Sequence, residues 1–350
     1  MTPPTASDEV QTLPVDRVTE WVGDRLPGAG SPFDAQRIGQ EVGIANVLFA
    51  LRRDGHAFVL RRPPAVKNAP SASDIRREWR VLTALEGTPV PHPAPLLFCD
   101  DAAVIGAPFL IMSFVDGFTP VGTLPPPYDV PPPRRALGFA MADAIADLSA
   151  VDWQARGLHD FGKPVGFLDR QVSRWMGQLE TYQTRDIPGL DALAAWLEAK
   201  RPQVQQPPGL LHGDYSPFNV MATTARPERL AAVVDWDSST VGDPVLDIGH
   251  LLARWTEPGE EPALLHLDIL DRDGLPRRKE LAARYAERSG HDISALPYYE
   301  ALALFKLGLI LEGGVRRAEA AGDAGRAAET AATVDRLIQV AGLFARGERA

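Results

Sequence analysis

The stretch HGDYSPFN, residues 212–219, decides how the rest of the chain is interpreted. It follows the short apolar pair Leu210-Leu211, so Asp214 and Asn219 lie five positions apart on a tight loop after a strand and can point into the same pocket. Phosphoryl transfer needs a carboxylate that accepts the proton of the attacking hydroxyl, and oxygen ligands for Mg²⁺. Asp214 suits the first role and Asn219 the second. An ordinary turn, in which Asp and Asn hydrogen-bond their own backbone, remains the alternative for this stretch alone.

A second acidic position follows about twenty residues later in VVDWD, residues 233–237. The apolar run over Leu230 to Val234 predicts a strand that delivers Asp235 into the open, where a second Mg²⁺-ligating carboxylate is expected. Two acidic loops after two strands indicate a site made of a base and a metal. An exposed strand end is the simpler alternative for Asp235.

These residues resemble the family of aminoglycoside phosphotransferases and related kinases. The loop of that family reads His-Gly-Asp, four variable residues and Asn, which is the order at 212–219. The resemblance implies that Asp214 is the catalytic aspartate and that Asn219 and Asp235 bind Mg²⁺, with ATP or GTP as the phosphate donor. The stretch GDPVLDIG, 242–249, is also similar, and there Asp247 supports the catalytic loop from the start of a helix. A simple helix cap is the alternative for Asp247.

The branch that the chain resembles includes the kinase-like domain fused to some acyl-CoA dehydrogenases. Four runs carry this resemblance: FVLRRPP (58–64), REWRVLTAL (77–85), VIGAPFLIMSFVDG (104–117) and YYEALALFKLGLILEGG (298–314). In the related sequences a His often stands where this chain has Ser149, so this chain departs from the family's pattern at that helix end.

The order of elements is rich in strands first and rich in helices later, which indicates two lobes rather than a doubly wound sheet. Strands are expected at Ile38 to Leu51 and Ala57 to Arg62, joined at Asp54-Gly55. The resemblance implies an α+β, two-lobed protein-kinase-like fold, with a small antiparallel sheet and a helix first and a larger, mainly helical part second. We expect a flexible N-terminus over residues 1–14, a nucleotide-binding lobe over 15–115 and a catalytic and substrate-binding lobe over 116–350.

Kinases hold the α- and β-phosphates with a strand lysine that is paired with a helix glutamate. Arg61 occupies the matching place in this chain, and arginine can grip phosphate with two hydrogen bonds. Glu78 is its expected partner. Arg62 points to the other face of the strand and is the second candidate. For Arg61 and Glu78 alike, an exposed charge is the simpler alternative.

Two further segments are assigned to the nucleotide by the resemblance. Gly43 and Asn46 belong to the turn that covers the phosphates, although the family's loop usually carries more glycine. Adenine is expected against Ser113, Phe114 and Val115, whose backbone offers one acceptor and one donor to the base. A buried strand is the alternative for that segment.

The sequence is less informative about the phosphate acceptor. The late helices, which line the substrate side in this family, carry Lys306 inside an apolar run, where it either snorkels to solvent or meets an anionic substrate. Acidic residues of the same region, which could instead attract a cationic aminoglycoside, are Glu257, Glu260, Glu261 and Glu300. A hydroxyacyl thioester or hydroxy acid and an aminoglycoside antibiotic therefore both remain open.

Composition excludes several other classes. The formal net charge of -10 disfavours nucleic acid as a partner. The single cysteine, Cys99, cannot form an intrachain disulfide or a cysteine-based zinc site. No apolar run is long enough to span a bilayer and no secretory signal is evident, so a cytoplasmic location is expected. The oligomeric state is open.

Two competing hypotheses accompany the small-molecule kinase. One is a catalytically silent nucleotide-binding or regulatory module, against which the presence of Asp214, Asn219 and Asp235 together argues. The other is a protein kinase, which the His-Gly-Asp loop and the missing Asp-Phe-Gly triplet disfavour.

Overall fold

The chain folds into two compact units. The computed structural model describes residues 13–39, 46–63, 75–203, 206–264, 269 and 272–349. The first unit comprises Met1–Gly87, His92–Asp116 and Asp235–Ser238. The second comprises Thr88–Pro91, Gly117–Val234 and Ser239–Ala350. The boundary between residues 115 and 116 stays a prediction, because compactness alone does not show which segments fold on their own.

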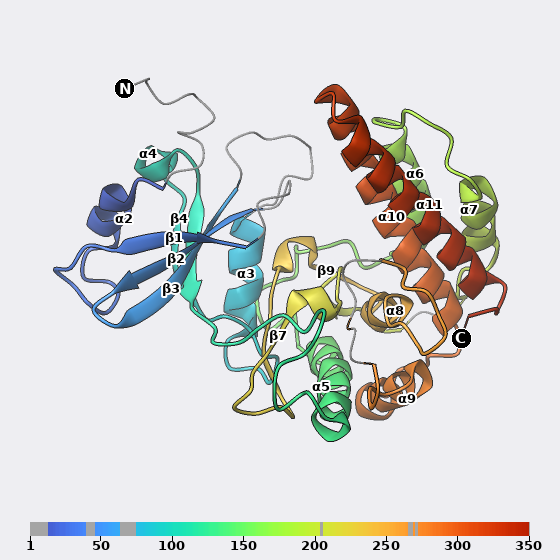
Figure 1. The fold of residues 1–350 in the computed structure, drawn as a ribbon, viewed down its shortest axis with the longest axis horizontal. Coiled ribbons are helices and arrows are strands. Elements are labelled where there is room, and N and C mark those ends of the chain that lie inside the picture. Colours follow the sequence, from blue (N-terminus) through green and yellow to red (C-terminus); the bar gives the residue numbers. More distant parts are fainter. Residues whose placement is uncertain are drawn as a thin grey trace. The chain divides into compact units, whose positions relative to one another are not determined.

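The first unit is built on a five-stranded antiparallel sheet in the order β1-β2-β3-β5-β4 (Figure 1). Its strands are β1 (Asp34–Ile38), β2 (Val47–Arg53), β3 (His56–Arg62), β4 (Pro95–Cys99) and β5 (Phe109–Ser113). Its helices are α2 (Val15–Val22), α3 (Ile75–Leu85) and the short α4 (Ala102–Ile105). The expected antiparallel sheet with an accompanying helix is therefore confirmed.

The predicted hairpin forms at the expected turn. Arg53 pairs with His56, and the two residues between them, Asp54 and Gly55, have φ angles of 49° and 75°. Both central residues of a type I′ turn need positive φ, which explains the Asp-Gly pair. The prediction of one strand from Ile38 to Leu51 is wrong, because that run is divided between β1 and β2.

An apolar core fixes α2 on the sheet. Val18 and Val22 are fully buried on the inner side of the helix, and Leu51, Leu60 and Ile111 are fully buried on the strands. Alternation along a strand directs such residues to one face of the sheet, where the helix covers them. The core therefore holds β3, which carries Arg61, in a defined register.

The second unit is mainly helical. Its helices are α5 (Pro131–Ser149), α6 (Gln171–Leu179), α7 (Leu190–Ala199), α8 (Val245–Ala253), α9 (Arg278–Ser289), α10 (Leu296–Ala320) and α11 (Ala324–Ala345). The prolines that precede Arg134 belong to α5 itself, because proline is tolerated in the first turn, where its missing N–H costs nothing. The expected helix-rich second part is confirmed.

Two small sheets frame the HGDYSPFN loop. β6 (Gly209–Leu211) pairs with β9 (Thr240–Gly242), and β7 (Val220–Ala222) pairs with β8 (Leu230–Val233), both antiparallel. The loop therefore leaves one sheet and enters the other through the short 3-10 turn Pro217–Asn219. Both of its ends are fixed by backbone hydrogen bonds.

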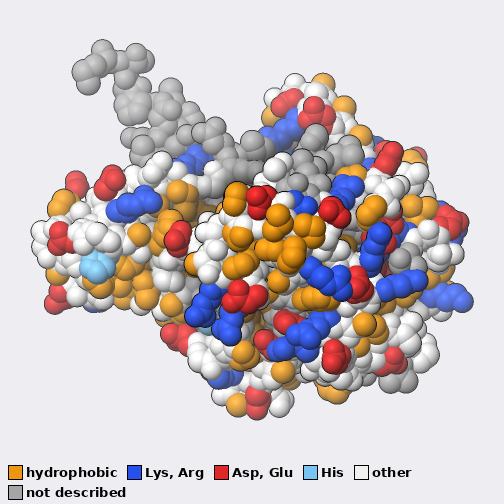
Figure 2. Space-filling model, turned by 60° about the horizontal axis from the view of Figure 1, so that its bottom comes forward, with side chains coloured by type: hydrophobic (Ala, Val, Ile, Leu, Met, Phe, Trp, Pro, Cys, Tyr) orange, Lys and Arg blue, Asp and Glu red, His pale blue; other side chains and the backbone are white. Residues whose placement is uncertain are grey.

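The surface mixes charges of both signs. Figure 2 shows Lys and Arg side chains interleaved with Asp and Glu on the face that it draws. Ion pairs between α5 and α9 contribute, such as Arg284 Nε with Asp143 Oδ1 at 2.7 Å.

Within the described ranges, no helix is long and apolar enough to cross a membrane.

A close approach of α8 and α10 depends on one glycine. A Cβ added at buried Gly249 would lie 2.7 Å from Cβ and 2.9 Å from the carbonyl carbon of Tyr299. Tyr299 cannot easily move, because its hydroxyl donates to Asp243 Oδ2 at 2.8 Å. The helices can pack at this distance only without a side chain at position 249.

We predict that Gly249→Ala destabilises the protein by about 1–3 kcal/mol, because it overpacks this contact. The matched control is Gly177→Ala in α6, where a new Cβ meets nothing within 4 Å. That change replaces an exposed helical glycine and should stabilise the protein by up to about 1 kcal/mol. Urea unfolding of both variants measures the two effects, and a shared sign would contradict the packing argument.

Candidate active site

The backbone of the HGDYSPFN loop is held by one buried carboxylate. Asp247, in the first turn of α8, accepts the His212 N–H on Oδ2 at 2.7 Å and the Gly213 N–H on Oδ1 at 2.9 Å. Burial raises the pKa of Asp247, while the two N–H groups counter that effect. Gly213 has a φ of 81°, a conformation that favours glycine. The predicted support of the loop by Asp247 is confirmed.

His212 is fully buried and connects the loop to the end of β8. Its Nδ1 accepts the Asp214 N–H at 3.3 Å, so Nε2 carries the proton and donates to Val234 O at 2.9 Å. Val234 also donates its own N–H to Asn219 O at 2.9 Å. The histidine therefore acts as a structural bridge in the loop.

Asp214 and Asn219 are brought together as expected. Asn219 Nδ2 donates to the backbone oxygen of Asp214 at 2.9 Å and to its Oδ2 at 3.3 Å. The other carboxylate oxygen, Oδ1, lies 3.0 Å from Nη2 of Arg254. About a third of the Asp214 side chain, 35%, remains exposed, so an acceptor hydroxyl can reach it. The catalytic role of Asp214 stays a prediction.

Arg254 is a site residue that the sequence analysis missed. It lies at the end of α8 with only 5% of its side chain exposed. Besides Asp214 it contacts Tyr215 O at 2.8 Å through Nη2, and His250 O at 3.2 Å through Nε. A cation directly after the apolar run Leu251-Leu252-Ala253 was the available signal, because a buried charge requires a partner.

Lys306 reaches the same loop from α10. Its Nζ donates to Gly213 O and lies 5.6 Å from the centroid of the Trp175 ring. Burial lowers the pKa of Lys306, and the carboxylates of Asp214 and Asp247 counter that effect. The half-buried side chain turns toward the loop and not to solvent, so snorkelling, one of the two alternatives for Lys306, is not what the structure has. Two cations, Lys306 and Arg254, thus surround the loop that carries Asp214.

A separate charge cluster lies in the first unit. Arg61 on β3 places Nε 2.8 Å from Glu78 Oε2 of α3, and Nη2 2.5 Å from Asp235 Oδ1. Asp237 Oδ2 lies 3.6 Å from the same Nη2. The structure therefore pairs Arg61 with Glu78, and Arg61 also forms an ion pair with Asp235. A contact of Arg61 with phosphates stays a prediction.

Burial dominates the electrostatics of this cluster. Only 7% of the Arg61 side chain and 2% of the Glu78 side chain are exposed. Burial and the carboxylates of Asp235 and Asp237 raise the pKa of Glu78 against the effect of Arg61. For Arg61, burial acts to lower the pKa, but the three surrounding carboxylates outweigh it and raise the pKa. The guanidinium therefore stays charged.

Asp235 has an unusual backbone. Its φ is 69°, and non-glycine residues with positive φ are uncommon and often found at functional sites. It directly follows Val234, whose N–H is bonded to Asn219 O. This uncommon backbone conformation sets the direction of the Asp235 carboxylate, which agrees with a functional role for that group.

The two predicted metal ligands offer suitable atoms for Mg²⁺. Asp235 has a partly exposed carboxylate, and Asn219 donates through Nδ2, so its Oδ1 is the atom that could coordinate a cation. In the described part of the chain, no group of three or more His, Cys, Asp or Glu side chains forms a metal site. In proteins Mg²⁺ is commonly held by one or two carboxylates together with phosphates and water.

The other predicted nucleotide contacts are Gly43 and Asn46 before β2 and the segment from Ser113 to Val115 after β5. Gly43 lies outside the described residues, and Asn46 directly precedes β2. Ser113 donates its N–H to Ala94 O at 2.9 Å, so a backbone donor for adenine would come from Phe114 or Val115. Phe114 is exposed, with 38% of its surface accessible. These assignments stay predictions.

Two further positions from the sequence analysis are Arg62, the second candidate for the phosphate contact, and Ser149, which stands where related sequences often have His. The Arg62 guanidinium lies 5.9 Å from the Phe49 ring centroid. Burial lowers the pKa of Arg62, and the positive charge of Arg37 lowers it further. Ser149 turns back to its own helix, where Oγ donates to Ala146 O at 2.8 Å.

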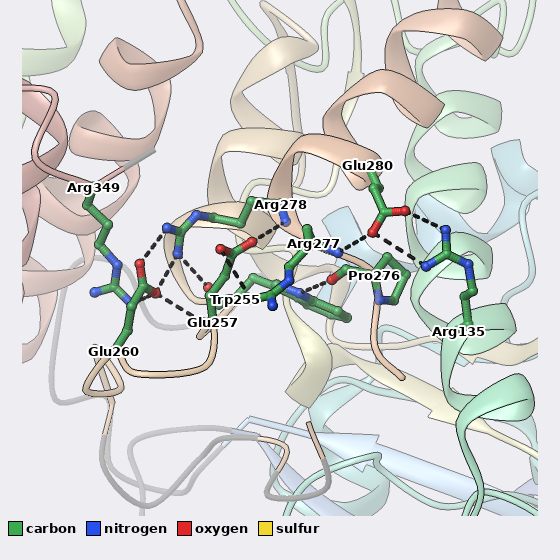
Figure 3. A network of polar contacts seen from close by, with 9 residues as sticks. All are labelled: Arg135, Trp255, Glu257, Glu260, Pro276, Arg277, Arg278, Glu280 and Arg349. Atoms are coloured by element: carbon green, nitrogen blue, oxygen red, sulfur yellow. Dashed lines mark hydrogen bonds and ion pairs between the residues drawn. The ribbon is translucent and has the colours of Figure 1, made fainter. Parts of the chain in front are cut away.

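The acidic residues after α8 are paired within the protein. Figure 3 shows Glu260 between two arginines, with Arg278 Nη1 and Arg349 Nη2 both 2.7 Å from its Oε2. Burial alone would raise the pKa of Glu260, but the hydrogen bonds from Arg278 and other donors lower it to about 2. Glu257 Oε1 accepts the Arg278 N–H at 2.7 Å (Figure 3).

The other two glutamates of this group are Glu261 and Glu300. Glu261 Oε2 lies 2.7 Å from Arg336 Nη1. Glu300 is buried, and burial raises its pKa to about 8. Three of the four glutamates therefore contact arginines and the fourth, Glu300, is buried, while 79% of the Glu261 side chain is exposed.

Comparison with known proteins identifies the family. The model of the phosphotransferase enzyme family matches residues 36–281. Acyl-CoA dehydrogenase family member 11 of Rattus norvegicus is 32% identical over 326 residues, covering 87% of this chain and 40% of the rat protein. The chain thus spans about two fifths of the length of that relative.

Solved structures agree with the fold. A Ralstonia eutropha JMP134 structure, named as a candidate aminoglycoside phosphotransferase, superposes with a TM-score of 0.79 and 30% identity, covering 96% of this chain and 99% of the other. A thermostable mutant of aminoglycoside phosphotransferase APH(4)-Ia, in complex with ADP and hygromycin B, has a TM-score of 0.58 and 16% identity, covering 88% and 94%. At that identity the second likeness shows the fold alone. This chain belongs to the phosphotransferase enzyme family and has the kinase-like α+β fold of its members.

Proposed function

We propose that the protein is an ATP-dependent phosphotransferase that phosphorylates a hydroxyl group of a small molecule. The observation that carries this proposal is the partly exposed Asp214 carboxylate, oriented by Arg254 and Asn219 on a loop that Asp247 fixes. A carboxylate that is fixed in this way can accept a proton from a hydroxyl held at one place. Positioning and electrostatics of this kind dominate phosphoryl transfer. GTP remains an alternative donor.

The chain's own residues divide the work. Asp214 accepts the proton of the acceptor hydroxyl as that oxygen bonds to the terminal phosphorus and the bond from this phosphorus to the bridging oxygen breaks, which releases ADP. Arg254 and Asn219 keep the Asp214 carboxylate in place. Arg61, held by Glu78, is proposed to grip the α- and β-phosphates. Asn219 and Asp235 would hold Mg²⁺, which when bound neutralises phosphate charge.

The charges near Asp214 favour an anionic acceptor. Lys306 and Arg254 place positive charge at the loop, and the acidic residues after α8 are neutralised by the protein's own arginines. A polycationic aminoglycoside would meet repulsion at the first place and little attraction at the second. The likeness to acyl-CoA dehydrogenase family members agrees with a hydroxyacyl thioester or hydroxy acid as the acceptor class.

The catalytic base is tested by Asp214→Asn. This variant keeps the shape of the side chain but removes the proton acceptor, so turnover should fall by about a hundredfold to ten-thousandfold. The affinity for Mg-ATP, measured by calorimetry, should be nearly unchanged. Asp147→Asn, which alters a surface ion pair on α5, is the control and should keep full turnover. Near-normal turnover of Asp214→Asn would show that another group serves as the base.

The role of Arg254 is tested by a pair of substitutions. Arg254→Met removes the charge that holds Asp214 and should lower turnover by about ten- to a hundredfold through misplacement of the carboxylate. Arg254→Lys retains a cation and should recover part of that loss. Trp255→Phe, which removes the neighbouring hydrogen bond to Pro276 O, controls for general loosening. Equal turnover in the Met and Lys variants would contradict a positioning role.

The acceptor class is tested by a panel. Hydroxyacyl-CoA thioesters, hydroxy acids and aminoglycosides are each incubated with Mg-ATP, and phosphorylated products are detected by mass spectrometry. We expect a product with an anionic hydroxylated acceptor and none with kanamycin or hygromycin B. Preferential phosphorylation of an aminoglycoside would overturn this acceptor assignment while leaving the reaction type intact.

A further inference from the structure

Arg61 contacts three carboxylates through two nitrogens of one guanidinium. Nε faces Glu78 at 2.8 Å, while Nη2 faces Asp235 at 2.5 Å and Asp237 at 3.6 Å. A guanidinium can do this because its donors form a rigid planar fork, whereas an ammonium is a point charge. Arg61 therefore holds Asp235 without releasing Glu78.

The cluster carries more negative than positive charge. Three carboxylates, those of Glu78, Asp235 and Asp237, lie around one guanidinium. Glu78 is buried, whereas 38% of the Asp235 side chain and 27% of the Asp237 side chain are exposed. Added positive charge would thus reach the cluster from the side of Asp235, where Arg61 already occupies Oδ1.

We propose that Arg61 is a positioning residue that occupies Asp235 in the nucleotide-free protein and thereby opposes metal binding there until phosphates arrive. The inference rests on the proposed function, in which Asp235 is a metal ligand and Arg61 contacts phosphates. A phosphate offers the guanidinium a new bidentate partner, so Nη2 can leave Asp235 while Nε stays with Glu78. Metal and nucleotide then bind together.

The physical reason is competition for one carboxylate oxygen. A cation that approaches Asp235 must displace a charge-assisted hydrogen bond and also meets the repulsion of a buried guanidinium. Both costs disappear when Arg61 turns to an anion. The same arginine is therefore expected to weaken metal binding without nucleotide and to strengthen nucleotide binding.

The test measures Mn²⁺ binding to the nucleotide-free protein by electron paramagnetic resonance. Arg61→Gln should bind Mn²⁺ about tenfold more tightly than the wild type or better, because a close charge pair is removed. ATP affinity of the same variant, measured by calorimetry, should fall. Opposite changes from one substitution distinguish competition from general damage to the site.

Further variants make the result specific. Arg62→Gln, on the neighbouring position of β3, removes an equal charge and should leave Mn²⁺ affinity within a factor of about two, since the Arg62 guanidinium lies over the Phe49 ring. Adding Asp235→Asn to Arg61→Gln should abolish the gain. If Arg61→Gln folds poorly, Arg61→Gln with Glu78→Gln removes the buried imbalance and should show the same gain.

The outcomes separate this inference from the proposed function. Unchanged or weaker Mn²⁺ binding in folded Arg61→Gln, or an equal gain in Arg62→Gln, overturns the inference even if ATP binds and turnover is seen. A gain that requires Asp235, in a protein that binds no nucleotide, upholds the competition at Asp235 and refutes the proposed kinase.

Discussion

The candidate catalytic loop depends on the buried carboxylate of Asp247. Its two oxygens each accept one backbone N–H, from His212 and Gly213, so a single side chain fixes two successive peptide groups. Such a carboxylate resists displacement, because a buried N–H left without its acceptor is costly. The direction in which Asp214 leaves the loop follows from this constraint, and the contacts of Asp214 with Arg254 and Asn219 build on it.

Local sequence signals predicted the elements that local physics determines. The Asp54-Gly55 turn could be predicted from the sequence, because only a few residue types accept two successive positive φ angles. The division between β1 and β2 was not predicted, because Val42, Ile44 and Ala45 extend the apolar pattern toward β2 and no proline marks the break. β9 also escaped notice, since three residues carry no period and their pairing with β6 is set by the tertiary fold.

The candidate site divides in the same way. Asp214 and Asn219 lie within one motif, and Asp235 directly follows a strand, so sequence alone could single them out. Arg254 and Lys306 meet the loop from two different helices, and only the packing of those helices shows that they converge. Arg61 was found through a resemblance, but its second partner, Asp235, lies 174 residues further along the chain and needed the structure.

The missing side chain at Gly249 has a consequence for motion. α8 supplies Asp247 to the loop backbone and α10 supplies Lys306 to Gly213 O, and the two helices meet backbone against side chain at Gly249 and Tyr299. Separating the helices would therefore pull at the loop from two directions. The His212 and Gly213 amide protons should consequently exchange with solvent only through the large opening that frees α8 from α10, among the slowest events in the native ensemble.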